Sequence, residues 1–408
     1  MKDRLTLLLI VALVALTASG RRLSSLHVSG NQLCDAKGRT VRLHGVMDTP
    51  NPYFNSHRWG YRCDDKSVGA CISYFDKLCN AITDNRQGAF CNVLRLHLDP
   101  CWTNDPALKS NNKEKGEADI SRFSEARLAK YLDTLYLPII QTALRHGLYV
   151  VVRPPGVCPH NLRVGDDYQR YLETVWGMVA RHPRFQKLSG VVSLELANEP
   201  VDVRMADGSR SPLALHDYFQ PIVDRIRRNG FKGIIWIPGA GYQSQYADYA
   251  SHPITDSNFG YAVHVYPGWY GASDEHCDHE AFIRQFHQQV PVVDTQPIIV
   301  TEIDWSPIRP GAGKRNEFGQ WVPSNLGTWA TASTSKWGNA WKAVLDHYSN
   351  ISMTLSGTDV YIDVPCYLST DKVKPAFDGN TEACGAACFQ WYREMAKTRN
   401  NKPNISNP

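Results

Sequence analysis

Short runs of apolar and β-branched residues recur along this chain and alternate with longer amphipathic segments. Strands that are apolar along their whole length are typical of a parallel sheet that is covered on both faces. The pattern therefore predicts eight buried parallel strands. They are expected over residues 41–46, 92–98, 148–153, 191–197, 233–238, 261–266, 297–303 and 351–362.

The segments between these runs carry apolar positions at helical spacing. Residues 124–146 show it best, with Glu125 in the first turn, Gly147 as a C-terminal stop and an apolar stripe along one side. The stripe consists of Leu128, Leu132, Leu135, Ile139 and Ala143. Further helices are expected over residues 69–83, 168–180, 213–229, 281–289 and 336–348.

Alternating strands and helices of this number predict an α/β fold, a (β/α)8 TIM barrel with enlarged βα loops, formed as one domain over residues 21–400. No glycine-rich motif of the G-x-G-x-x-G or Walker type follows a strand, which argues against a dinucleotide or nucleotide cofactor. In such a barrel, catalytic side chains lie at the C-terminal ends of the strands.

The sequence patterns at the two ends of the chain differ from the pattern of this domain. Residues 1–20 combine a charged start, an apolar stretch over 5–16 and the small residues Ala18-Ser19-Gly20, which is the layout of a signal peptide. The apolar stretch is too short to span a bilayer comfortably, so an uncleaved anchor is the weaker alternative. We expect a secreted (extracellular or periplasmic) monomer with no membrane segment after signal removal, and a flexible tail over 401–408. The basic run over 393–402 reads as solvated.

The chain contains 11 cysteines, an odd number without the paired close spacings of a zinc site. In an exported protein, disulfide bonds are the better interpretation, although the pairing stays open and at least one thiol is left over. Cys384 and Cys388 form the one tight pair, a weak metal signal on a possible helix. Sequons occur at Asn350 and Asn404.

The amino-acid composition limits the class of molecule that the protein can be expected to bind. Lys and Arg number 44 against 40 Asp and Glu, and the formal net charge of +4 is too weak to indicate nucleic acid. Hydrophobic residues make up 43% of the chain, which excludes a disordered protein, and 11 Trp with 19 Tyr indicate aromatic-rich loops. Aromatic side chains stack well on the apolar faces of sugar rings, so an uncharged sugar polymer fits both features.

Two glutamates stand where strands end. Glu199 follows the run over 191–197, and Glu302 lies at the end of the run over 297–303. Polar residues are costly in a strand buried on both faces, so we expect them there only for a function. A pair of carboxylates about 5 to 5.5 Å apart is what retaining glycoside hydrolysis requires.

Other strand ends supply polar helpers. Arg95 shares one parity with His97 and Asp99, and an arginine beside a carboxylate keeps it ionised. His264 and Tyr266 also occupy alternate positions of one strand and so point to the same side, and Trp269 follows them in the chain. These residues are the candidates for orienting the two glutamates and binding substrate.

The motifs Leu-Ala-Asn-Glu-Pro over 196–200, His-Val-Tyr over 264–266 and Ile-Val-Thr-Glu over 299–302, with Leu-Arg-Leu over 94–96, occur in this order at strand ends. Together they resemble glycoside hydrolase family 5, the cellulase-like family of clan A. The resemblance implies that Glu199 is the acid/base, Glu302 the nucleophile, Asn198 a partner of the sugar 2-hydroxyl and Tyr266 the residue that orients Glu302. It implies no cofactor and no metal.

The resemblance makes an endo-β-1,4-glucanase the expected activity, with a polysaccharide or oligosaccharide as substrate. A β-mannanase, another β-glycosidase or an inactive carbohydrate-binding barrel are the alternatives. Two departures bear on the substrate: strand three ends in Arg153-Pro154-Pro155 instead of the usual histidine, and strand eight lacks the usual tryptophan. Trp269 and Trp305 are the candidates for a sugar platform.

Several polar residues have a structural interpretation beside the functional one. Glu195, four positions below Glu199, is expected to be a buried partner of an arginine. Asp304 and Asp359 are expected to cap loops, and His97, His146 and His160 to be satisfied or surface histidines. For Arg95, the alternative to a catalytic role is a core ion pair.

Overall fold

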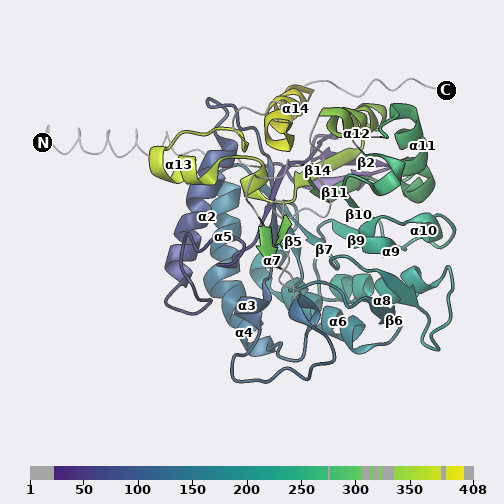
Figure 1. The fold of residues 1–408 in the computed structure, drawn as a ribbon. Coiled ribbons are helices and arrows are strands. Elements are labelled where there is room, and N and C mark those ends of the chain that lie inside the picture. Colours follow the sequence, from purple (N-terminus) through teal and green to yellow (C-terminus); the bar gives the residue numbers. More distant parts are fainter. Residues whose placement is uncertain are drawn as a thin grey trace, which may run out of the picture.

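The computed structural model describes residues 23–273, 276–305, 313–315, 321–323, 335–377 and 383–398 (Figure 1). The predicted signal peptide over 1–20 and the predicted tail over 401–408 lie outside these residues. None of the helices in the described ranges is long and apolar enough to cross a membrane.

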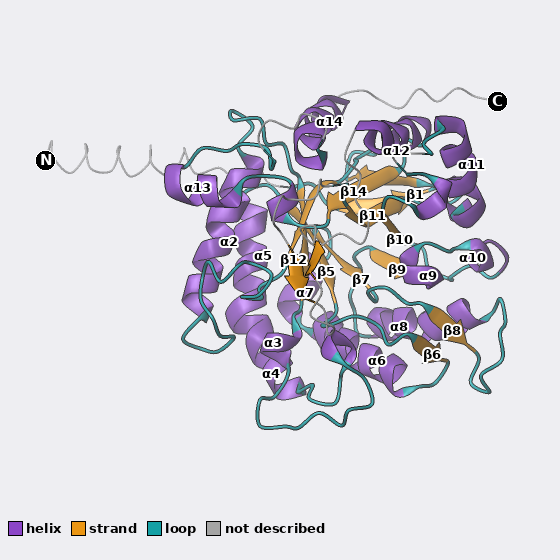
Figure 2. Cartoon of the chain, in the orientation of Figure 1, coloured by secondary structure: helices purple, strands orange, loops and turns teal. Residues whose placement is uncertain are grey.

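Eight parallel strands close into a barrel, in the order β10-β11-β14-β3-β4-β5-β7-β9. Helices surround the strands in Figure 2, and the predicted (β/α)8 fold is confirmed. The barrel closes where β14 pairs with β3. The strands are β3 (His44–Asp48), β4 (Val93–His97), β5 (Tyr149–Arg153), β7 (Val192–Glu195), β9 (Ile235–Pro238), β10 (Phe259–Val265), β11 (Ile298–Ile303) and β14 (Ile351–Leu355).

Burial on both faces explains why these strands read as continuous apolar runs. Every residue of the eight strands except Met47 is buried. Arg95, Glu195, His264 and Glu302 are charged or titratable exceptions to the apolar rule, and each lies in a barrel strand. Their cost must be offset by contacts with one another, which the site provides.

The covering helices follow the predicted amphipathic segments, apart from α14, which was not predicted. They are α2 (Val68–Thr83), α4 (Glu125–Tyr131), α5 (Leu137–Arg145), α6 (Asp167–Arg181), α8 (Ala214–Arg228), α11 (His279–Gln289), α12 (Ser335–His347) and α14 (Cys384–Thr398).

The predicted helix over 124–146 contains a wider turn that the periodicity does not reveal. Ser124 caps α4 by accepting from the N–H of Arg127, and the π-helical turn η2 (Leu132–Tyr136) joins α4 to α5. Pro138 is the second residue after this turn; it has no N–H, and its ring would collide with the carbonyl of residue 134 in a regular helix. The π turn accommodates the proline without ending the helix.

A hairpin of β1 (Leu26–Ser29) and β2 (Gln32–Asp35) covers the N-terminal end of the barrel, and the sequence pattern did not predict it. Leu26 and Leu33 pack with inward-facing strand residues such as Val151, Trp236 and Ile299. This apolar plug fills the lower barrel and leaves the polar residues to the opposite, C-terminal end.

The loops hold short elements. Two small parallel strands, β6 (Asn161–Arg163) and β8 (Asp202–Arg204), pair with each other beyond the barrel strands β5 and β7, while β12 (Gly313–Arg315) pairs with β13 (Trp321–Pro323). The short helices are α3 (Pro100–Thr103), η1 (Gly116–Ala118), α7 (Pro183–Leu188), α9 (Ala240–Gln243), α10 (Ala247–Ser251), η3 (Trp269–Gly271), η4 (Pro291–Asp294), η5 (Thr358–Val360) and α13 (Val364–Thr370).

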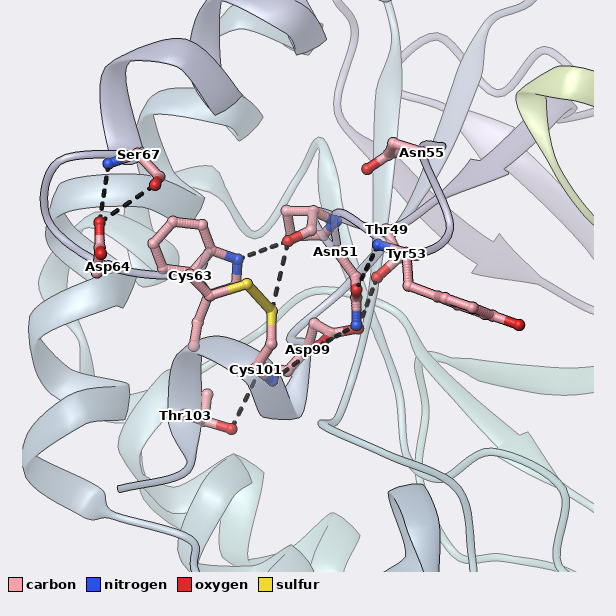
Figure 3. Close-up of a disulfide and its surroundings, with 12 residues drawn as sticks. Thr49, Asn51, Tyr53, Asn55, Cys63, Asp64, Ser67, Asp99, Cys101 and Thr103 are labelled. Atoms are coloured by element: carbon pink, nitrogen blue, oxygen red, sulfur yellow. Dashed lines mark hydrogen bonds between the residues drawn. A yellow bond between two sulfur atoms is a disulfide. The ribbon is translucent and has the colours of Figure 1, made fainter. Parts of the chain in front are cut away.

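A disulfide between Cys63 and Cys101 joins the loop after β3 to the short helix after β4 (Figure 3). Beside it, Asn51 and Thr49 donate to the carboxylate of Asp99, each at 3.0 Å. The first two catalytic-side loops are thus fastened together covalently and by hydrogen bonds. Other cysteines form no disulfide in the structure, contrary to the broader expectation: Cys34, Cys71, Cys79, Cys91, Cys158, Cys366 and Cys388. Burial in the core explains most of them.

In its described part, the run predicted as solvated over 393–402 exposes the charged side chains of Arg393, Glu394 and Lys397, but it is helical and packs one face against the core. Residues up to Thr398 belong to α14, where Met395 is 8% exposed and Arg393 lies over the ring of Phe90 at 5.5 Å. The apolar face of this helix, shared with Trp391, outweighs the surrounding charge.

Candidate active site

Glu199 and Glu302 meet at the C-terminal end of the barrel. Glu302 lies in β11, and Glu199 follows β7. Carboxylate oxygens of the two residues and a ring nitrogen of His264 lie within 4.8 Å of one another. The sequence placed these three side chains at three separate strand ends, and the barrel brings them together.

Arg95 occupies the centre of this site and is completely buried. Its Nη1 donates to Oε1 of Glu302 at 2.7 Å, and its Nη2 donates to Oδ1 of Asn198 at 2.7 Å. Its Nε and Nη2 also donate to the carboxylate of Glu195, at 2.6 and 2.9 Å. One guanidinium therefore orients the predicted nucleophile and the predicted sugar-binding amide together.

Glu195 takes the structural role expected of it. It is fully buried and binds Arg95 through both oxygens; its Oε1 also accepts from the Oγ1 of Thr301 at 2.9 Å and from the Nε2 of Gln243 at 3.2 Å. Its carboxylate oxygens are thus satisfied by donors below the reacting groups.

The environment of Glu302 favours its ionised form. Burial works against ionisation, but the electrostatic effects of His264, Arg95 and Arg153, with the hydrogen bond from Arg95, outweigh it and lower the pKa of Glu302 to about 2. The hydroxyl of Tyr266 donates to Oε2 at 2.9 Å. The surroundings therefore favour the ionised form of Glu302, and two hydrogen bonds fix its orientation.

Glu199 is held differently. Its oxygen Oε1 lies 3.0 Å from Nδ1 of His264, and its side chain contacts no arginine within the described site. Its backbone has φ = 58°, a left-handed conformation that costs a non-glycine residue roughly 1–2 kcal/mol. The backbone N–H donates to Oε1 of Gln243 at 2.7 Å, which holds the residue in that conformation.

Gln243 is a site residue that the sequence analysis missed. It is fully buried, and its Nε2 donates to Glu195 and to the carbonyl of Ala262, both at 3.2 Å. It ends the short element α9 after β9, in which Gly241, Tyr242 and Gln243 all have a left-handed backbone, with φ of 59°, 59° and 61°. A glutamine in a glycine-containing loop has no pattern that distinguishes it from a surface residue.

The family assignment follows from a comparison with protein-family models. The model described as cellulase (glycosyl hydrolase family 5) matches residues 63–350, which is more than half of the 408 residues. The chain belongs to glycosyl hydrolase family 5. Its matched span contains every predicted site residue, from Arg95 to Trp305.

Solved structures agree with the fold of this family 5 chain. The native β-glucanase of Saccharophagus degradans has a TM-score of 0.58 and 16% identity over 94% of this chain and 96% of that chain. The catalytic domain of an endoglucanase from Thermobifida fusca has a TM-score of 0.53 and 18% identity over 90% of this chain and 97% of that chain. At these identities the likeness establishes the barrel. No curated protein matches the chain in a sequence comparison.

The two tryptophans expected as sugar platforms of the family 5 site differ in placement. Trp269 is partly exposed, and its ring stands at 78° to that of Tyr266 with centroids 5.3 Å apart. Trp305 is fully buried between Trp337 and Trp391, at centroid distances of 5.5 and 5.2 Å. Its ring faces are covered by other indoles, so the expectation of a platform is not met by Trp305 in this structure.

Asp304 and Asp359 lie outside the catalytic group. Asp304 is buried and accepts from the hydroxyl of Ser356 at 3.1 Å. Asp359 binds both terminal nitrogens of Arg58, at 2.9 and 2.8 Å, and so ties the loop after β14 to the loop after β3. The structural interpretation of both aspartates agrees with these contacts.

Strand three of this family 5 barrel ends in Arg153, which is buried and turned toward its neighbours. Its Nη2 lies 2.7 Å from Nδ1 of His97 and 3.8 Å from Oε2 of Glu117. His97 is thus part of the site and not a surface histidine, whereas His146 pairs with Asp76 at the surface and His160 is exposed. Glu117 comes from the short helix η1 in the loop after β4, and the sequence analysis did not single it out.

The three groups Glu199, His264 and Glu302 could hold a metal ion on distance alone. The guanidinium of Arg95 lies within hydrogen-bonding distance of Glu302, however, and a second cation there would be repelled. The carboxylates and the imidazole already have partners in one another, in Arg95 and in Tyr266. The donor set therefore suits proton transfer and nucleophilic attack better than metal binding.

Proposed function

We propose that this family 5 chain is a secreted, retaining glycoside hydrolase that cleaves β-1,4-linked polysaccharide as an endo-β-1,4-glucanase. The observation that carries the proposal is the contrast between the two glutamates. Glu302 is ionised and oriented by Arg95 and Tyr266, whereas Glu199 is held by His264 and by its backbone.

The contrast assigns two roles. The carboxylate of Glu302 attacks the anomeric carbon of the sugar, and Glu199 protonates the leaving oxygen, so that a covalent glycosyl-enzyme forms. Glu199, now ionised, takes a proton from water as the water attacks the same carbon. A separation of about 5 to 5.5 Å suits this double displacement, and it is supported by carboxylate oxygens that lie within 4.8 Å of each other.

Aromatic side chains on the catalytic side support a sugar polymer as substrate. Tyr53, Phe54 and Tyr61 in the loop after β3 are 75%, 49% and 80% exposed. Figure 3 shows the ring of Tyr53 pointing away from the disulfide and from Asp99. Together with Trp269, these rings offer apolar faces on which pyranose rings stack.

The choice of glucan rests on similarity. A second structure of the Saccharophagus degradans β-glucanase, with a TM-score of 0.58 and 16% identity, is a complex with cellotetraose. Secretion is supported by the apolar stretch over residues 5–16 and by the Cys63–Cys101 disulfide, a bond that persists in oxidising compartments.

The test is release of reducing ends from β-glucan, carboxymethyl cellulose, mannan and xylan by the wild type, Glu302→Gln and Glu199→Gln. Glu125→Gln, an exposed carboxylate in α4, is the matched control. We expect turnover of a glucan, loss of at least about 1,000-fold in both site variants and no change in the control. Absence of turnover on every polymer would refute the hydrolase, and unchanged turnover by Glu302→Gln would refute the nucleophile.

Azide distinguishes the two roles, because it is a strong nucleophile that needs no general base. With Glu199→Ala it should attack the glycosyl-enzyme and give a β-glycosyl azide, whereas with Glu302→Ala it should attack the substrate directly and give an α-glycosyl azide.

Proton NMR of the first product of the wild type should show the β-anomer. Addition of EDTA to the same assays should leave the rates unchanged.

A further inference from the structure

His97 ends β4, and its side chain belongs to the lining of the catalytic end of the barrel. It has the same parity as Arg95, two positions before it, whose side chain reaches Glu195 and Glu302 across the barrel interior. His97 therefore also points inward, one step closer to the mouth. In the β-ladder it stands opposite Arg153, the last residue of β5, and it is 4% exposed.

The contact with Arg153 fixes the tautomer of this histidine. A guanidinium nitrogen only donates hydrogen bonds, so Nδ1 of His97, 2.7 Å from Nη2 of Arg153, must be the acceptor. The ring proton then resides on Nε2. Burial and the nearby charges of Arg153, Arg95 and His264 lower the pKa of His97 well below its usual value, so the ring stays neutral.

Arg153 is itself held in place. It donates to the carbonyl oxygens of Gly156 and Pro154, and the carboxylate of Glu117 lies 3.8 Å from its Nη2. A Cβ on Gly156 would meet the carbonyl oxygen of Glu117 at 2.1 Å, so a glycine is required for this close approach of the two loops. The arginine cannot swing away from His97 without breaking these contacts.

The remaining ring nitrogen of His97 has no partner. Nε2 is buried and makes no hydrogen bond with any residue in the described part of the chain. A buried donor left unsatisfied costs about 1–3 kcal/mol, and such groups are rare in native proteins. Here the donor lies at the catalytic end of the barrel, next to Arg153 and close enough to Arg95 and His264 for their charges to act on it, and a sugar hydroxyl bound there would satisfy it.

We propose that His97 is a substrate-binding residue whose Nε2–H donates to a hydroxyl of the sugar bound over Glu302, and that Arg153 is the positioning residue that fixes its tautomer. The inference rests on the proposed glycoside hydrolase function. A neutral donor suits an uncharged hydroxyl oxygen, and Arg153 acts on the same site because its charge also contributes to the low pKa of Glu302. In this arrangement Nε2–H of His97 is the donor, and it lies beside Arg153, which ends the third barrel strand, β5.

Two substitutions separate the roles of the two ring nitrogens of His97. His97→Asn places an amide oxygen near the position of Nδ1 and keeps the acceptor for Arg153, but it removes the donor toward the sugar. His97→Gln places an amide nitrogen near the position of Nε2 and keeps that donor, but it loses the acceptor. We expect kcat/KM on β-glucan to fall about 10- to 100-fold in His97→Asn and less than about 5-fold in His97→Gln, without loss of folded protein in either variant. The opposite order would show that His97 only supports Arg153 and would overturn the proposal.

Deoxy substrates locate the hydrogen bond. The substrates are 4-nitrophenyl β-cellobioside and its analogues that lack single hydroxyls on the sugar next to the scissile bond. For the wild type, one of these deletions should cost about 10-fold or more in kcat/KM, and in His97→Asn the same deletion should cost almost nothing. Equal losses in both proteins for every hydroxyl would contradict a direct contact.

The role of Arg153 is tested on the tautomer itself. In protein labelled with ¹⁵N-histidine, the signal of His97, assigned by its loss in His97→Asn, should show a protonated Nε2 and an unprotonated Nδ1. Arg153→Met should mix the two tautomers and lower kcat/KM, and Arg153→Lys, which still donates, should restore most of both. A fixed Nε2–H tautomer in Arg153→Met would overturn the positioning role.

If the wild type cleaves no glycan, the proposed function and this inference are both refuted. If His97→Asn behaves as wild type while Glu302→Gln is inactive, only the inference about His97 is refuted.

Discussion

Nη1 of Arg95 lies 2.7 Å from Oε1 of Glu302, while the same guanidinium binds Glu195 on its other side. The two interpretations of this arginine, a core ion pair and a partner of the proposed nucleophile, are therefore compatible with each other in one side chain. Glu195 compensates most of the charge of the buried arginine, and the remaining positive field acts on Glu302. In the proposed mechanism Arg95 serves both stability and catalysis, so variants are needed that separate the two effects.

Removal of Arg95 should damage stability and activity by different routes. Arg95→Met leaves Glu195 as an uncompensated buried charge, and we expect a loss of about 3–5 kcal/mol in the free energy of unfolding in urea. The double variant Arg95→Met with Glu195→Gln should regain most of that stability and remain inactive. If the double variant also regains activity, the arginine is not needed to orient Glu302.

The low pKa of Glu302 predicts how its contribution to stability depends on pH. Its folded value of about 2 lies below the usual 4.5, so above pH 4.5 both the folded and the unfolded chain carry the charge and the stabilisation is complete. Between about pH 4.5 and 2 the unfolded chain takes up a proton that the folded protein does not, and stability is lost as the pH falls.

Glu302→Gln removes this dependence. The difference in unfolding free energy between the wild type and Glu302→Gln should therefore shift against the wild type by about 2 kcal/mol from pH 5 to pH 3. Urea titrations at both pH values measure it. A difference that does not change with pH would mean that Glu302 has an ordinary pKa.

Gln243 should affect turnover more than substrate binding. Gln243→Met keeps the length of the side chain but removes the acceptor for the N–H of Glu199, which then has no support for its left-handed backbone. We expect kcat to fall about 10- to 100-fold with KM changed less than about 3-fold. Gln245→Met, at an exposed position of the same loop, is the control and should behave as wild type.

Asp48 at the end of β3 should destabilise the protein at neutral pH. Burial raises its pKa from 3.8 to about 6, although Thr358, Asn55 and the N–H of Thr49 donate to it. An acid with a raised folded pKa contributes stability at low pH that is lost as the pH rises through about 4 to 6.

Asp48→Asn has the same shape, keeps an oxygen for the N–H of Thr49 and for Asn55, and carries no charge. We expect it to raise the free energy of unfolding by about 1–3 kcal/mol at pH 8 and by much less at pH 4. Thermal and urea unfolding at the two pH values provide the measurement. A variant that is less stable than the wild type at pH 8 would show that the ionised carboxylate is fully satisfied by its donors.

The strands and the two glutamates could be predicted because both leave a local pattern: continuous apolar runs, each ending in a polar residue. The hairpin of β1 and β2 could not, since its four-residue strands are too short to show a period. Trp305 illustrates a second limit: its place after β11 is readable, but whether its ring faces solvent depends on Trp337 and Trp391, which come from distant helices. Gln243 and Glu117 likewise acquire their roles only through contacts between loops.

The closing seam of the barrel, where β14 pairs with β3, constrains how the chain can fold. The N–H of Leu43 donates to Oγ of Ser352, a residue 309 positions later. The first barrel strand, β3, therefore cannot complete its pairing until the last strand, β14, is in place. Until then β3 is an open edge, and the high contact order of this pairing makes the final step slow. A nascent chain of this kind completes its barrel only after synthesis is nearly finished, and until then its unpaired strand edges remain open to contacts with other chains.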